Sequence, residues 1–176
     1  VGSAEEGNVV LLKKGTYDLS ETLSVNKKIV IRGESGDPAD VVLDAGKKGR
    51  VITMTAPAVV ECVTVRNGSQ SGQPSYGAGV HMTAGTLWKC VVTSCSFASG
   101  RDQYGAGISM DGKGTLVEDC EVTGCSCASS CMNFYGGLYN KNGTVRRVSV
   151  HDTTTTADIR YYPLGACVEG ADALVE

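Results

Sequence analysis

The chain has 176 residues, of which 41% are hydrophobic and 23 are glycine, and its formal net charge at pH 7 is −3. This length predicts one domain with a real hydrophobic core, and the small net charge argues against a nucleic-acid-binding role. No apolar run approaches the ~18 residues of a membrane-spanning helix, so we expect no membrane span in this segment.

The N-terminal third predicts a succession of short strands. They are Val9–Leu12, Leu23–Val25, Lys28–Ile31, Val41–Asp44, Val51–Met54 and Val59–Val65. Turn residues such as Gly15, Gly33 and Gly46 lie between them. No stretch has a helical period long enough for the crossover helix of a βαβ unit.

From residue 76 onward, two motifs recur in the same order. The first is Tyr76-Gly-Ala-Gly-Val80, which returns as Tyr104-Gly-Ala-Gly-Ile108, as the shorter Tyr135-Gly-Gly-Leu138 and as Leu164-Gly-Ala-Cys-Val168. The second is Gly85-Thr-Leu-Trp-Lys-Cys90, which returns at Gly114 and Gly143 and continues each time into a strand. A repeat of roughly 28–31 residues without helices predicts stacked coils whose equivalent strands pair in parallel. We therefore predict an all-β solenoid of about six coils, forming a single domain over residues 1–176.

Two stretches carry a family resemblance. VVLLKKGTYDLSETLSVNKKIVIRGESGDPADVVLDA resembles the opening coils of the pectate-lyase-like right-handed parallel β-helix superfamily, and VVECVTVRNG resembles its common coil strand ending in a turn asparagine. The Gly-Ala-Gly-Ile and Cys-x-Val-Thr repeats are similar to those of bacterial surface β-helix proteins, including polymorphic outer-membrane proteins. The resemblance covers nearly the whole chain and implies a right-handed β-helix. It implies no single function, because this superfamily contains lyases, hydrolases, adhesins and stalks.

The ends of the chain suggest a longer array. Val1 opens in mid-pattern, no capping helix precedes Val9, and residues 165–170 begin a further coil. Solenoids need capping repeats to protect their open edges. We expect a fragment of a longer solenoid, with end-to-end contact to further coils or to another chain.

The eight cysteines are an even number, which suits an oxidising compartment and a secreted or cell-surface location. Cys90 and Cys120 share one column of the repeat, and Cys95 and Cys125 share another. Neighbouring rungs lie ~4.8 Å apart, within the range that a disulfide spans. We expect buried thiols in the first column. The disulfide candidates are Cys95, Cys125, Cys127 and Cys131, with a loop disulfide between the last two. The alternative, a four-thiolate zinc site, lacks the ligand spacing of a zinc ribbon or knuckle, so no metal is expected there.

A column of alternating charge precedes the cysteine positions. Its members are Glu61, Lys89, Asp119 and Arg147. The register at Glu61 is open by one residue, because Val63–Val65 also aligns with the segment that begins at Cys90. Alternation is the arrangement that stacked rungs tolerate, and it predicts a surface salt-bridge ladder. The alternative is catalytic: in a uronate-polymer lyase, Lys89 and Arg147 would bind the carboxylate or remove the proton, and Asp119 would bind calcium.

Tyr76, Tyr104 and Tyr135 form a third column. We predict an aromatic ladder that rigidifies a corner, and the alternative is a platform that binds sugar rings. His81 has no partner at the spacing of a catalytic triad, and His151 with Asp152 is expected to be a solvated polar pair.

These features favour a structural or adhesive, glycan-binding segment of an extracellular β-helix protein, with a polysaccharide or a cell-surface protein as partner and no cofactor. One alternative is a polysaccharide lyase acting on an acidic glycan, with calcium as its cofactor, and a second is a polymerising stalk. The chain lacks the paired aspartates of polygalacturonase-like hydrolases and the Arg-x-Pro-x-x-Arg motif of pectate lyases. Whether it is an enzyme therefore stays open.

Overall fold

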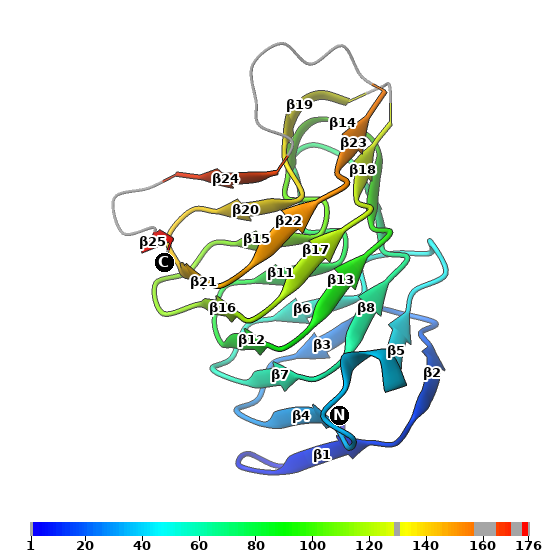
Figure 1. Ribbon diagram of the computed structural model, residues 1–176, viewed down its shortest axis with the longest axis vertical. Helices are drawn as coiled ribbons and strands as arrows, with labels where there is room; N and C mark the ends of the chain where they lie inside the picture. The colour runs from blue at the N-terminus through cyan, green and yellow to red at the C-terminus, as the bar shows by residue number, and fades with distance from the viewer. Residues whose placement is uncertain (1, 129–130, 157–164, 170–173, 176) are drawn as a thin grey trace.

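The computed structural model describes residues 2–128, 131–156, 165–169 and 174–175. Within these residues, the regular structure is 25 short strands and one 3-10 turn, η1 (Pro38–Asp40). The strands wind into a parallel β-solenoid of about five turns, close to the six expected (Figure 1). The predicted all-β coil is therefore confirmed.

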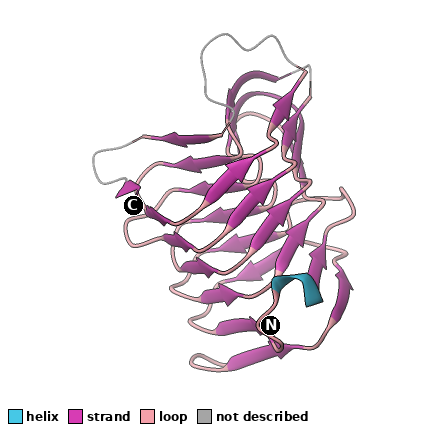
Figure 2. Cartoon of the chain, viewed as in Figure 1, coloured by secondary structure: helices cyan, strands magenta, loops and turns pink. Residues whose placement is uncertain are grey.

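Four sheets, which we name A to D, run along the solenoid (Figure 2). Sheet A contains β1 (Val9–Leu12), β4 (Val30–Gly33), β7 (Val59–Glu61), β12 (Thr86–Trp88), β16 (Leu116–Glu118), β21 (Thr144–Arg146) and β25 (Leu174–Val175). Sheet B contains β2 (Gly15–Asp18), β5 (Val41–Asp44), β8 (Thr64–Arg66), β13 (Val91–Thr93), β17 (Glu121–Thr123) and β22 (Ser149–His151).

The other two sheets complete each coil. Sheet C contains β3 (Leu23–Val25), β6 (Ile52–Met54), β11 (Val80–Met82), β15 (Ile108–Met110), β20 (Leu138–Asn140) and β24 (Ala166–Val168). Sheet D contains β9 (Ser69–Ser71), β10 (Ser75–Tyr76), β14 (Ser96–Tyr104), β18 (Ser126–Cys127), β19 (Cys131–Tyr135) and β23 (Thr154–Thr155). From β7 onward, a full coil passes through sheets A, B, D and C in that order.

Stacked apolar columns fill the interior. Val60, Leu87 and Val117 lie in register on sheet A, and all three are fully buried. Alternate residues of each strand face inward, as the period of two in a β-strand requires. Burial of each such side chain contributes roughly 1.5–3 kcal/mol, so the repeat is stabilised coil by coil.

The second glycine of the Gly-Ala-Gly motif allows a close approach across the interior. A Cβ at Gly107 would lie 2.5 Å from a methyl carbon of Val122 and 3.1 Å from the sulfur of Cys125. Gly79 has the same relation to Val92 and Cys95, at 2.7 Å and 3.0 Å. A side chain at either position would require neighbouring core residues to move, which explains the repeated glycine.

Two details differ from the sequence-based expectation. The segment Val59–Val65 is not one strand: it bends at Cys62, which has a φ of 56°, and so joins β7 to β8 across a sharp corner. The fourth motif copy is also displaced, because Leu138 pairs with Ala166 and not with Val168.

Candidate functional site

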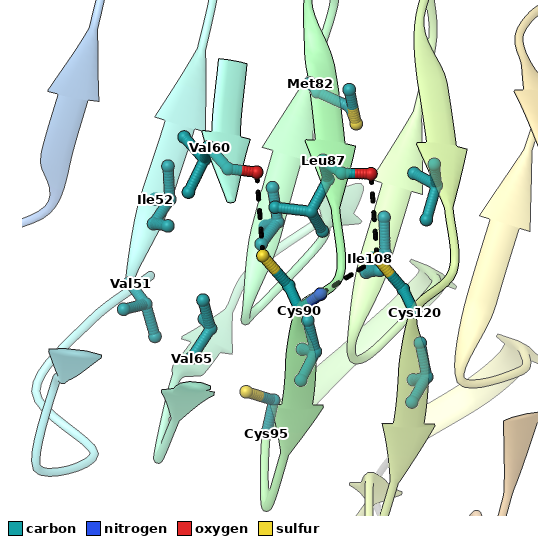
Figure 3. Close-up of a cluster of buried hydrophobic side chains, with 14 of the residues drawn as sticks. Val51, Ile52, Val60, Val65, Met82, Leu87, Cys90, Cys95, Ile108 and Cys120 are labelled. Carbon is teal, nitrogen blue, oxygen red and sulfur yellow. Dashed lines mark hydrogen bonds between the residues drawn. The ribbon is translucent and has the colours of Figure 1, made fainter. Parts of the chain in front are cut away.

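The cysteines Cys90 and Cys120 lie in the interior of the solenoid. Cys90 and Cys120 are free and buried, and they lie on neighbouring rungs (Figure 3). The thiol of Cys90 donates to the carbonyl oxygen of Trp88 at 3.3 Å, and that of Cys120 donates to the carbonyl oxygen of Glu118 at 3.1 Å. Burial raises the pKa of Cys90 well above its ordinary value, so a reactive thiolate does not form there. The expected column of buried thiols is confirmed.

The disulfide expectation needs a correction. Cys95 and Cys125 are free thiols, so no disulfide joins them in the structure. Each thiol instead donates to the carbonyl oxygen two residues earlier, at 3.3 Å for Cys95 to Thr93 and 3.6 Å for Cys125 to Thr123. Disulfide bonding of Cys127 is present, and this residue is not among the free thiols. The side chain of Cys131 lies outside those described, so a pairing of Cys127 with Cys131 stays a prediction.

The three tyrosines of the repeat stack on one another. The ring centroids of Tyr76 and Tyr104 are 4.9 Å apart with an interplanar angle of 12°, and those of Tyr104 and Tyr135 are 4.5 Å apart with an angle of 13°. The parallel register produces this arrangement, because it places the three residues on successive rungs. Both flat faces of the Tyr104 ring are therefore occupied by neighbouring rings, which favours a ladder over a sugar-binding platform.

A second layer lies against this ladder, on the outer face of sheet C. The Tyr76 ring is 5.5 Å from that of His81, and the Tyr104 ring is 4.8 Å from that of Tyr139. Burial and the charge of Arg50 lower the pKa of His81. Burial and a hydrogen bond to Glu169 raise the pKa of Tyr139. Both groups are therefore neutral at pH 7, and this face is a packed aromatic surface.

Ser109 is expected to tolerate alanine in this layer. It lies between His81 and Tyr139 in the register of sheet C, is fully buried, and its hydroxyl has no hydrogen-bond partner in the structure. Because an unpartnered buried hydroxyl is destabilising, Ser109→Ala should raise the free energy of unfolding by about 1 kcal/mol. Urea denaturation measures this change. A decrease would show that a buried water molecule satisfies the hydroxyl.

The charged column lies at the corner between sheets A and B. Lys89, Asp119 and Arg147, which we call the charged corner, have φ values of 48°, 52° and 47°. At the same corner of the preceding coil, the residue with a left-handed φ is Cys62 rather than Glu61. Glu61 is instead registered with Trp88 on sheet A, where it is buried and paired with Arg32. Of the two registers left open by the sequence, the alignment of Val65 with Val92 is confirmed, which removes Glu61 from this column.

Ion pairs connect the charged corner. The guanidinium Nε of Arg147 lies 2.6 Å from Asp119 Oδ1, and Nη2 lies 2.7 Å from Glu118 Oε1. The indole N–H of Trp88 donates to Asp119 Oδ2 at 3.0 Å, and Lys89 Nζ lies 4.5 Å above the Trp88 ring. Arg147 and Trp88 lower the pKa of Asp119, and Asp119 with Glu118 raises the pKa of Arg147 further above its ordinary value. These contacts favour the protonated form of Arg147, which suits binding of a carboxylate better than removal of a proton.

Asp119→Ala should lower the free energy of unfolding by no more than the ~1–2 kcal/mol that alanine costs at a left-handed φ, here 52°. Loss of the ion pairs should add little, because they are exposed: the Arg147 side chain is 62% accessible. The emission of Trp88, the only tryptophan in the chain, should shift to longer wavelength as its N–H turns to water. Denaturation and fluorescence spectra of the same sample check both points. A large loss of stability would contradict the view that this ladder lies at the surface.

An open pocket of about 490 Å³ lies beside the charged corner, and we call it the corner pocket. Lys89, Asp119, Glu121 and Arg147 line it from three successive rungs. Gly36 and Pro38, in the loop that contains η1, form part of its lining. Thr64 holds this loop by donating to the Pro38 carbonyl at 2.8 Å.

The described residues contain no group of three or more His, Cys, Asp or Glu side chains placed to hold a metal ion. Both carboxylate oxygens of Asp119 accept hydrogen bonds from Arg147 or Trp88, so a calcium ion would have to displace these donors. The described part also contains no helix of the length and apolarity needed to cross a membrane.

The sequence identified Lys89, Asp119 and Arg147, and the structure brings them together at one corner. It did not identify Glu121 or the loop around Pro38 as their neighbours, although Glu121 follows Asp119 by two residues. Comparison of the chain with family models, with curated proteins and with solved structures found no match. The arrangement of the corner pocket is therefore the basis for any functional assignment.

Proposed function

We propose that this chain is a structural, glycan-binding segment of an extracellular β-helix protein, and that the corner pocket is its binding surface. The observation that carries the proposal is the polar lining of this pocket by Lys89, Asp119, Glu121 and Arg147 on successive rungs. An extended polymer lying across the rungs would meet one set of these groups every ~4.8 Å.

The chemistry of the lining suits carbohydrate. Charged and hydrogen-bonding side chains alternate along the pocket, and sugar hydroxyls both donate and accept hydrogen bonds. Long solenoid faces bind extended partners through many weak contacts of this kind. The resemblance to bacterial surface β-helix proteins supports an extracellular location and a pectate-lyase-like, right-handed coil.

Binding can be measured directly with the 176-residue chain. Oligosaccharides of pectate, alginate and glycosaminoglycans should change the emission of Trp88, because this residue contacts both Lys89 and Asp119. In calorimetry, Lys89→Ala should weaken binding at least about tenfold through loss of a charged hydrogen bond.

Lys141→Ala is the matched control, because Lys141 pairs with Asp111 and does not line the pocket. It should leave affinity unchanged. If no oligosaccharide gives heat or alters fluorescence, the binding role is rejected and a structural role alone remains.

A lyase acting on an acidic glycan remains the alternative. The mutual pairing of Asp119 and Arg147 does not favour it, because both groups would have to leave that pair to bind calcium and substrate. The same oligosaccharides, incubated with calcium and separately with a chelator, test this alternative. Calcium-dependent ultraviolet absorbance from an unsaturated uronate product would establish lyase activity.

A further inference from the structure

His151 connects a titratable group to the corner pocket. It lies at the end of β22, in register with Thr123 of β17. Its Nε2 is 2.9 Å from Glu121 Oε1, and its Nδ1 is 2.9 Å from Asp152 Oδ2. Glu121 and Ser149, which lies on the same strand as His151, both line the pocket. The histidine therefore contacts one wall of the proposed binding surface from outside.

The protonation state of this imidazole determines how many of the two carboxylates receive a hydrogen bond from it. A neutral imidazole carries one N–H and can donate to only one of them, whereas an imidazolium donates to both. Asp152 and Glu121 accordingly raise the pKa of His151. With a raised pKa, His151 stays cationic to a higher pH than an unperturbed imidazole, and it becomes neutral as the pH rises through that higher midpoint.

We propose that protonation of His151, acting through Glu121, sets the charge of the corner pocket and thereby its preference for anionic over neutral glycans. This inference rests on the glycan-binding function proposed above. When His151 is protonated, Glu121 is neutralised by a partner outside the pocket. When His151 is neutral, the Glu121 carboxylate presents an uncompensated negative charge to the ligand.

Among the described residues, no other titrating group accounts for the same response. The described groups that face His151 are Glu121 and Thr123 on β17 and Asp152 in the following turn, and β22 is the last strand of sheet B in this part of the chain. Asp119 and Glu118 raise the pKa of Arg147, which therefore keeps its charge over the relevant pH range. His81 lies on sheet C and has its pKa shifted in the opposite direction.

The coupling can be tested without any ligand. The chain has two histidines, so proton NMR should resolve two imidazole titrations. We expect the midpoint of His151 to lie above about 6.5 and that of His81 below it. Glu121→Gln should lower the His151 midpoint and leave that of His81 unchanged. Glu118→Gln is the control, because Glu118 pairs with Arg147 and should not affect His151. A wild-type His151 that titrates as a free imidazole would overturn the inference.

The consequence for binding is tested with an oligouronate and its carboxyl-reduced counterpart, which share length and linkage. From about pH 5.5 to about pH 8.5, the affinity for the oligouronate divided by the affinity for the reduced oligosaccharide should fall about two- to fivefold. This is the effect of one unit charge acting over several ångströms near the surface. His151→Gln should abolish this change, whereas His81→Gln should preserve it. Retention of the full pH dependence in His151→Gln would refute the proposal. If neither oligosaccharide binds at any pH, the proposed function fails and the inference with it, and the NMR titration then shows whether the coupling itself is present.

Discussion

Gly105→Ala should destabilise the chain by about 4 kcal/mol or more, an effect that few single substitutions reach. Gly105 turns the chain from β14 into β15 with a φ of 63°. A Cβ there would lie 1.9 Å from the carbonyl oxygen of Ile108 and 2.7 Å from the amide nitrogen of Tyr139. Both are backbone atoms held in the ladder, so neither can move without breaking inter-coil hydrogen bonds. Chemical denaturation followed by circular dichroism measures the loss.

Gly114→Ala separates the steric effect from backbone strain. Gly114 also has a left-handed φ, of 85°, but a Cβ there would meet no atom within 4 Å. Gly114→Ala should therefore lower the free energy of unfolding by only ~1–2 kcal/mol, the cost of placing alanine in the left-handed conformation. Equal losses in the two variants would show that the close approach at Gly105 is absent in solution.

Tyr104→Ala should lower the free energy of unfolding by about 3 kcal/mol. Its ring stacks between those of Tyr76 and Tyr135 and also contacts Tyr139, so its removal opens a gap at the centre of the aromatic layer. Tyr104→Phe retains the ring and should cost less than about 1 kcal/mol. Urea denaturation of both variants measures the difference.

The same pair of variants distinguishes a ladder from a sugar-binding platform. A platform residue would be dispensable for folding, and its removal would weaken glycan binding while leaving the denaturation midpoint in place. A stable Tyr104→Ala protein with reduced affinity would therefore restore the platform interpretation. We expect the opposite, because the stacked faces are closed to a ligand.

The columns of stacked residues could be predicted from the repeat. Tyr76, Tyr104 and the paired positions Cys90 and Cys120 recur at the coil period, and equivalent residues of a parallel solenoid must lie on neighbouring rungs. That single periodicity predicts the parallel sheets, the tyrosine stack and the ion pair between Asp119 and Arg147, because it can be recognised directly in the sequence.

The corners between the sheets were harder to predict from the sequence. A sharp turn that contains glycine can be predicted from the sequence. From β7 onward, the corner between sheets A and B has no glycine at its turning point, and the residues in the left-handed conformation there are Cys62, Lys89, Asp119 and Arg147. Of these residues only Asp119 is of a type that favours turns, and Cys62 gives no turn signal. The sequence therefore predicts Val59–Val65 as one strand and Glu61 as part of the charged column. Pairing with the neighbouring coils stabilises the bend and outweighs the local preference.

The residues that face one another across a coil or beside a corner could not be predicted from the repeat. The distance between Gly107 and Cys125, the position of Pro38 beside Lys89, and the contact of His151 with Glu121 depend on the shape of the coil cross-section. That shape is set by loops whose lengths differ from coil to coil, and the repeat carries no information about them. Periodicity therefore places a residue along the solenoid axis, whereas the packing of a whole coil determines which residues face one another across it.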